Sequence, residues 1–215
     1  MHSTVNTVQY GVMKEERKTR EGVPTRTVED WEEAALDIIA TRGIGALSIP
    51  DLARTLGVTK GSFYWHFATL ADLIAASVSR WEQSDRIALD EVREIADAAA
   101  RLEALFVQAM EAERAQSLFL TLSISPSAKV AAVIRRVSDR RIRLLIDSYR
   151  ELGLAEQLAH QQALLTYSAY IGGLHLRNGD SQWLRSRDDV KAYVQHATRL
   201  LISPRKEVGT GGRRR

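Results

Sequence analysis

Three helix-start signals lie within about 45 residues near the beginning of this 215-residue chain, and they limit its fold more than any other feature. In Thr27-x-x-Asp30, Ser48-x-x-Asp51 and Thr69-x-x-Asp72, a hydroxyl residue precedes a carboxylate by three positions. Each pair can satisfy free backbone amides in the first turn of a helix. Apolar residues at helical spacing follow each signal, so this region is predicted to be a compact group of helices.

The segment between the second and third signals is predicted to be a helix-turn-helix. Gly57 interrupts the helix that begins after Ser48, and Thr59 is placed to cap a third helix that runs through Phe67. A connection of only two or three residues between two short helices is typical of the motif.

The remainder of the chain also predicts helices, over residues 99–115, 117–123, 128–151, 155–178 and 188–202, and strand-like alternation is scarce. We therefore expect an all-α protein with an N-terminal three-helix helix-turn-helix domain and a larger helical domain. The expected divisions are a flexible arm (1–24), the helix-turn-helix domain (25–75), the larger domain (76–203) and a basic disordered tail (204–215).

Charge and composition exclude several classes of function. The net charge of +3 arises from the tail, so bulk charge does not indicate nucleic-acid binding. The chain has no cysteine, its five histidines include no pair four residues apart, and no phosphate-loop or catalytic constellation stands out. No apolar run approaches the length needed to span a bilayer. We expect a cytoplasmic protein without enzymatic activity, metal, cofactor or membrane partner.

The outer face of the segment Thr59–Phe67 carries the strongest functional signal. At 100° per residue, Phe63 and Phe67 point inward, whereas the outer face and its flank carry hydroxyl, aromatic and imidazole groups, from Ser62, Tyr64, Trp65 and His66. Such groups suit contacts with phosphates and base edges in a major groove. The alternative is that the three ring-bearing residues pack against the next long helix.

The run from Ile49 to Phe67 resembles the DNA-binding signature of the TetR family of bacterial transcriptional regulators, in its hydrophobic spacing, Gly57, Lys60-Gly61-Ser62 and Tyr64-x-His66-Phe67. The resemblance implies an N-terminal DNA-binding domain and a larger ligand-binding and dimerisation domain. It implies DNA contacts by Ser48, Thr59, Lys60, Gly61, Ser62, Tyr64, Trp65 and His66. One position differs from the family pattern: many members have a cation where this chain has Leu70. Either the chain loses a contact with a DNA phosphate there, or the leucine packs on a neighbouring side chain.

A single helix-turn-helix reads few bases, so we expect a homodimer on a near-palindromic double-stranded operator. Apolar and small residues of the last two helices are the candidate interface: Ala169, Gly172, Gly173, Leu176, Tyr193, Ala197 and Leu200. The glycine pair indicates either a close helix approach or a local kink.

A small-molecule effector site is predicted from apolar and aromatic residues of the larger domain: Phe106, Met110, Phe119, Leu122, Tyr149, Tyr167 and Tyr170. Each of them suits an ordinary core equally well. Arg136, Arg140 and Arg143 lie on one helical stripe, which is either a solvated face or a contact for an anionic ligand or a second subunit.

The predicted function is sequence-specific transcriptional regulation, in the form of a repressor that a small molecule releases from its operator. The alternatives are an activator without small-molecule control and a helical protein-interaction bundle. A bundle of that kind would not need the outward-facing set between Lys60 and His66.

Overall fold

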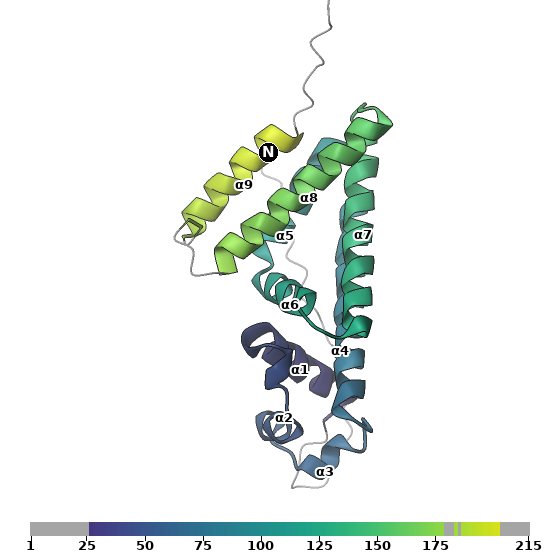
Figure 1. The fold of residues 1–215 in the computed structure, drawn as a ribbon, viewed down its shortest axis with the longest axis vertical. Helices are drawn as coiled ribbons and strands as arrows, with labels where there is room; N and C mark the ends of the chain where they lie inside the picture. The colour runs from purple at the N-terminus through teal and green to yellow at the C-terminus, as the bar shows by residue number, and fades with distance from the viewer. Residues whose placement is uncertain (1–25, 179–182, 185, 203–215) are drawn as a thin grey trace, which may run out of the picture.

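The computed structural model describes residues 26–178, 183–184 and 186–202, and every regular element within them is a helix (Figure 1). This confirms the all-α prediction. The elements are α1 (Val28–Arg42), the 3-10 turn η1 (Ile44–Ala46), α2 (Ile49–Leu56), α3 (Lys60–Phe63), α4 (Leu70–Arg93), α5 (Ala98–Glu111), α6 (Glu113–Ser123), α7 (Ala128–Glu151), α8 (Glu156–Asn178) and α9 (Arg187–Ile202). The arm and the tail predicted from the sequence lie outside the described residues. In the described part of the chain, no helix has the length and apolar character that crossing a bilayer requires.

The capping signals act as the sequence indicates. The backbone N–H of Asp30 donates to Thr27 Oγ1 over 3.2 Å, and the N–H of Thr27 donates to Asp30 Oδ2 over 2.9 Å. Thr69 and Asp72 repeat this reciprocal box at the start of α4. Ser48 accepts from the N–H of Asp51, which fixes the start of α2. These bonds satisfy amides that a helix leaves without an internal partner, so the helices begin at sharply defined residues.

Helix α4 connects the two ends of the molecule. Its first turns pack with α1 beside α2 and α3, and its later turns run alongside α7 (Figure 1). The domain boundary predicted at residue 75 therefore falls inside a continuous helix of 24 residues. A single cluster of buried side chains extends from Trp31 and Phe63 to Tyr170 and Ala197. The small helical group and the larger one thus share a hydrophobic core.

Ion pairs reinforce the contact between the two groups of helices. Arg114 of α6 pairs with Glu33 over 2.6 Å and with Asp37 over 2.9 Å, and both carboxylates are on α1. All three side chains are largely exposed, so water screens these pairs. They orient α1 on α6 more than they stabilise the fold.

Two arginines of the predicted stripe on α7 bind a carboxylate of α4. Arg136 donates to Glu82 through Nε (2.9 Å) and Nη2 (2.6 Å), and Arg140 Nη1 donates to Glu82 Oε1 over 3.0 Å. These bonds are intramolecular. Arg136 and Arg143 are exposed, and Arg140 is half-buried. The hydrogen bonds from Arg136, with those from Arg140, hold the pKa of Glu82 below its usual value.

We expect Glu82→Gln to destabilise the protein at neutral pH and to have little effect in acid. A carboxyl group whose pKa is lowered on folding contributes stability above its unfolded pKa, near 4.5, and loses it as the pH falls through the lower folded value. Water screens part of the interaction, so the loss at pH 7 should be about 1 kcal/mol, or roughly 2–4 °C in Tm. Thermal melts of both proteins from pH 7 to pH 3 test this, and a difference that stays constant with pH would contradict it.

Candidate DNA-binding surface and ligand cavity

The turn between α2 and α3 fixes the position of the predicted recognition segment. Leu52, Ala53 and Leu56 bury the inner face of α2. Gly57 then adopts the left-handed conformation (φ 70°, ψ 32°), in which a side chain would be strained, and its N–H bonds to the last carbonyls of α2. The chain therefore leaves α2 sharply and begins α3 three residues later, as the helix-turn-helix spacing predicts.

Phe63 anchors α3 to the rest of the domain. It is completely buried, and its ring meets the edge of Trp31 at 5.5 Å between centroids and lies 5.7 Å from the ring of Phe67. Both phenylalanines thus point inward, as predicted. The opposite side of the segment faces solvent.

The predicted extent of the third helix is wrong. The α-helix ends at Phe63, and Tyr64, Trp65 and His66 form a further turn closed by bonds from the N–H groups of His66 and Phe67 to the carbonyl of Phe63. Thr59 occupies the N-cap position, but its hydroxyl lies 3.2 Å from Ser62 Oγ and caps no amide. A four-residue helix depends on tertiary contacts, since it is too short to be stable by itself.

The structure places the predicted DNA-contact residues in two groups. Most of them lie on the solvent side of α3 and the turn that follows, where the exposed fractions of Tyr64 and Trp65 reach 63% and 88%. The others on this side are Thr59, Lys60, Gly61, Ser62 and His66, of which Ser62 and His66 are half-buried. Ser48 lies at the start of α2, where its hydroxyl also donates to Asp51 Oδ2 over 2.7 Å.

The exposure of Trp65 and of Leu70 distinguishes between packing and an outward-facing side chain at each position. Trp65 is too exposed to be packed against α4, so its ring is available for a partner. Leu70, in contrast, packs against the hydrophobic core at the start of α4. The geometry therefore favours the packing interpretation of Leu70 over an outward-facing one.

The comparisons with known proteins relate this segment to a known family. The model of the family described as "Bacterial regulatory proteins, tetR family" matches residues 33–76, which run from α1 into α4. The amino-terminal part of the chain is therefore similar to the tetR family. The HTH-type transcriptional regulators AcrR of Shigella flexneri and TtgR of Pseudomonas putida are similar to this chain. AcrR is 32% identical over 69 residues, which make up 32% of this chain and 30% of AcrR. TtgR is 35% identical over 71 residues, which make up 29% of this chain and 34% of TtgR. The chain thus spans about a third of the length of the curated relatives it matches.

Solved structures extend the likeness to most of the fold. A transcriptional regulator from Rhodococcus superposes with a TM-score of 0.69 at 21% identity, over 82% of this chain and 96% of that one. A regulator from Saccharomonospora viridis, solved in complex with choline, has a TM-score of 0.65 at 21% identity, over 80% and 94% of the two chains. At this level of identity, the similarity establishes the fold alone.

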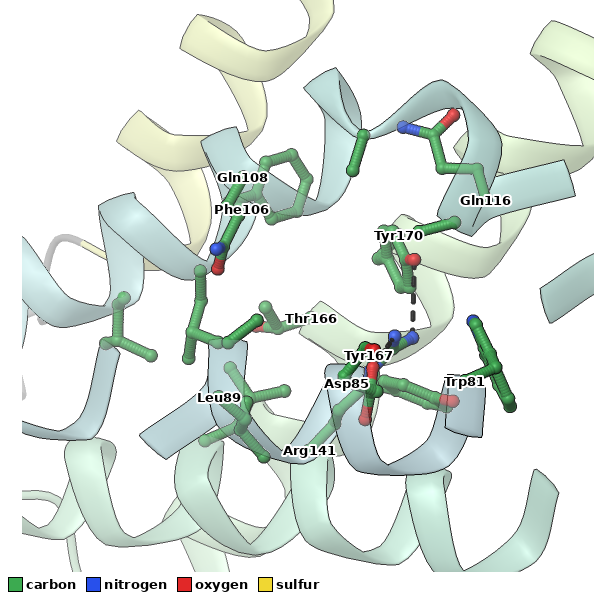
Figure 2. Close-up of a pocket in the computed structure, with 17 residues that line it drawn as sticks. Trp81, Asp85, Leu89, Phe106, Gln108, Gln116, Arg141, Thr166, Tyr167 and Tyr170 are labelled. Carbon is green, nitrogen blue, oxygen red and sulfur yellow. Dashed lines mark hydrogen bonds and ion pairs between the residues drawn. The ribbon is translucent and has the colours of Figure 1, made fainter. Parts of the chain in front are cut away.

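The larger group of helices contains a partly open cavity of about 300 Å³. Helices α4 to α8 supply its walls, with aromatic rings and leucines on most sides (Figure 2). Of the predicted effector residues, Phe106, Tyr167 and Tyr170 line it. Phe119, Leu122 and Tyr149 are buried in the core and do not line it. Met110 lies outside the described side chains.

The cavity also contains residues that the sequence did not single out. Asp85 of α4 and Arg141 of α7 form an ion pair at its wall, and Arg141 Nη1 donates to the hydroxyl of Tyr170 over 3.4 Å (Figure 2). The guanidinium group also lies 5.1 Å from the ring centre of Phe119, a cation–π distance. Burial raises the pKa of Tyr170 above its usual value, so this hydroxyl keeps its proton at neutral pH. In the described part of the chain, acidic and histidine side chains form no group that could hold a metal ion.

The residues predicted for a dimer interface divide between the inside and the outside of the subunit. Tyr193 donates its hydroxyl hydrogen to the carbonyl of Ala169 over 2.7 Å, and a Cβ on Gly173 would lie 3.0 Å from the Tyr193 ring. Gly173 therefore permits close approach of α8 and α9 within one chain, and Ala197 is buried. Gly172, Leu176 and Leu200 face solvent. So do Leu158, Leu164 and Leu165 of α8, which were not predicted.

The contrast between Phe63 and Trp65 can be tested through stability. Phe63→Ala should lower the free energy of unfolding by about 3–5 kcal/mol, because it removes a fully buried ring. Trp65→Ala should change it by less than about 0.5 kcal/mol, because the ring is exposed. Urea denaturation followed by circular dichroism measures both. A large loss in Trp65→Ala would show that the ring has a packing role.

Proposed function

We propose that this protein is a sequence-specific DNA-binding transcriptional regulator that acts as a homodimer, and that it is a repressor released from its operator by a small molecule. The observation that carries the proposal is the exposed surface of α3 and its following turn. Two large aromatic side chains, Tyr64 and Trp65, are presented to solvent by a segment whose inner face is firmly anchored. Folding gives no reason to expose them, whereas DNA contact does.

The proposed docking places α3 in the major groove. Gly61, which has no side chain, lets the backbone approach the DNA, and Lys60 brings a positive charge at the start of the helix. The hydroxyl of Tyr64 and the imidazole of His66 are suitable donors to phosphate oxygens. Trp65 can press its ring against a sugar or a thymine methyl group.

The homodimer is proposed from the apolar surface of α8 and α9. Leu165, Leu176 and Leu200 are 56%, 41% and 63% exposed, although a leucine gains free energy by leaving water. A second copy of the same surface would cover them, in keeping with a two-fold arrangement. Such a dimer would present two copies of α3 to the two halves of a near-palindromic operator.

Release by a small molecule is proposed from the position of the cavity. Its wall includes Trp81, Asp85 and Leu89 of α4, the same helix that begins beside α3. A ligand that moved α4 would also move the recognition segment. The likeness to a regulator solved with choline supports ligand binding in a fold of this kind.

Other functions fit the geometry less well. A protein-interaction bundle would not need the exposed set from Lys60 to His66. An activator without small-molecule control would not need a cavity of this size. A gel-shift assay with the promoter region beside the protein's own gene tests the proposal directly, and no specific shift at physiological salt would refute it.

Tyr64→Ala should weaken operator binding by about 1–3 kcal/mol, because a donor to a phosphate and a contact surface are both lost. Thr55→Ala, at an exposed position of α2, is the matched control and should bind like the unaltered protein. Fluorescence anisotropy with labelled operator measures both. Unchanged affinity in a folded Tyr64→Ala protein would contradict the docking proposed here.

Leu165→Glu and Gly172→Arg should each shift the protein from dimer toward monomer, because a charge would enter an apolar interface. Ala131→Glu places a charge at an exposed position of α7 and should leave the dimer intact. Light scattering reports the mass of each variant. If both α8 variants remain dimeric, the interface lies on another surface.

A further inference from the structure

We propose that the cavity binds a compact, neutral aromatic molecule that carries one hydrogen-bond donor, such as a phenol. The role of that molecule as an effector rests on the proposed function, but its chemical class does not. The chemical class follows from three properties of the cavity: a buried acceptor without a donor, one positive charge balanced by one negative charge, and aromatic rings around a small volume.

The unsatisfied acceptor is Asp85 Oδ2. This oxygen is buried and has no hydrogen-bond partner within the described residues, whereas Oδ1 of the same carboxylate binds Arg141 Nη2. The side chain is only 9% exposed, so bulk water does not replace the missing bond. A buried carboxylate oxygen without a donor is costly. A ligand O–H or N–H in the cavity would satisfy it.

Two hydroxyl groups in the cavity wall, those of Tyr167 and Thr166, are already engaged. Tyr167 donates its hydroxyl hydrogen to Ser138 Oγ over 2.8 Å, and the hydroxyls of Thr166 and Tyr149 lie 2.6 Å apart. Asp85 Oδ2, in contrast, is a buried acceptor in the wall that a donor on the ligand would satisfy.

The charge balance selects against ionic ligands. An anion drawn to Arg141 would also meet the carboxylate of Asp85, and a cation drawn to Asp85 would meet the guanidinium group. Both repulsions are strong in a poorly solvated site. A neutral donor avoids them and leaves the ion pair intact.

The walls set the shape and the size. The rings of Trp81, Phe106, Tyr167 and Tyr170 surround the space, together with Leu102 and Leu105 (Figure 2). A volume of about 300 Å³ corresponds to about ten water molecules, and so to a ligand with about ten non-hydrogen atoms. One or two fused rings with a hydroxyl group match both properties.

The test is calorimetric titration of the full-length protein, without DNA, with three probes at neutral pH: 2-naphthol, 2-methoxynaphthalene and 2-naphthoate. They share one ring system but present a donor, no donor and a negative charge. We expect 2-naphthol to bind at least about tenfold more tightly than its methyl ether, as a bond to a charged acceptor implies, and 2-naphthoate to bind most weakly. Equal affinities for 2-naphthol and the ether, or no binding of 2-naphthol, would overturn the proposal.

Asp85→Asn provides the second arm. Loss of the carboxylate leaves Arg141 without its counter-charge, so the preference should reverse, with 2-naphthoate gaining at least tenfold over 2-naphthol. Asp90→Asn, at an exposed position of the same helix, should keep the original order. If Asp85→Asn does not fold, Phe106→Trp reduces the cavity volume and should weaken 2-naphthol binding at least tenfold. A folded Asp85→Asn protein that still prefers 2-naphthol would refute the role of Asp85.

Addition of 2-naphthol to the protein–operator complex separates this inference from the proposed function. Selective binding without release of DNA would support the ligand class and refute effector control. Normal operator binding by a protein that does not bind 2-naphthol would refute the ligand class alone.

Discussion

The packing of α4 against α1 at one end and against α7 at the other is the constraint on which the rest of the structure depends. The first turns of α4 contribute Leu73 to the core beneath the recognition segment, and Trp81 and Leu89 reach the cavity. Because the helix is continuous and packs against both groups, neither group can shift relative to α4 without loss of side-chain packing. The position of α3 is therefore coupled mechanically to the larger group.

This coupling connects the cavity to the exposed surface of α3 and its following turn. Asp85 lies 15 residues after Leu70 on the same helix, a distance of about 22 Å at 1.5 Å per residue. A small tilt of α4 at Asp85 would become a displacement at Leu70 and so at the surface that carries Tyr64 and Trp65. The ion pairs of Arg136 and Arg140 with Glu82 lie between these positions and resist that tilt. In the proposed dimer, a ligand that tilts α4 would have to overcome these ion pairs before it could change the spacing of the two copies of α3.

The sequence predicts the fold well where local chemistry decides it. The capping pairs at Thr27 and Thr69 define helix starts because their bonds lie within one turn. The predicted ends of the later helices also agree closely with α7, α8 and α9. The third helix was predicted too long because Phe63 and Phe67 are four residues apart. That spacing keeps both rings on one face even though the chain leaves the α-helix after Phe63.

The site could be predicted only in part because its key pair is not local. Asp85 and Arg141 are 56 residues apart and belong to helices whose crossing no sequence period reveals. On its own helix, each resembles an ordinary surface charge. The aromatic residues were equally ambiguous, since Tyr149 and Tyr167 have the same character but only one faces the cavity. Such a site is recognised by a charged residue that has apolar neighbours on two helices. This can be seen only once the positions of the helices in space are known. The proposed ligand contact depends on the unsatisfied oxygen of Asp85, because most buried side-chain oxygens in folded proteins have a donor.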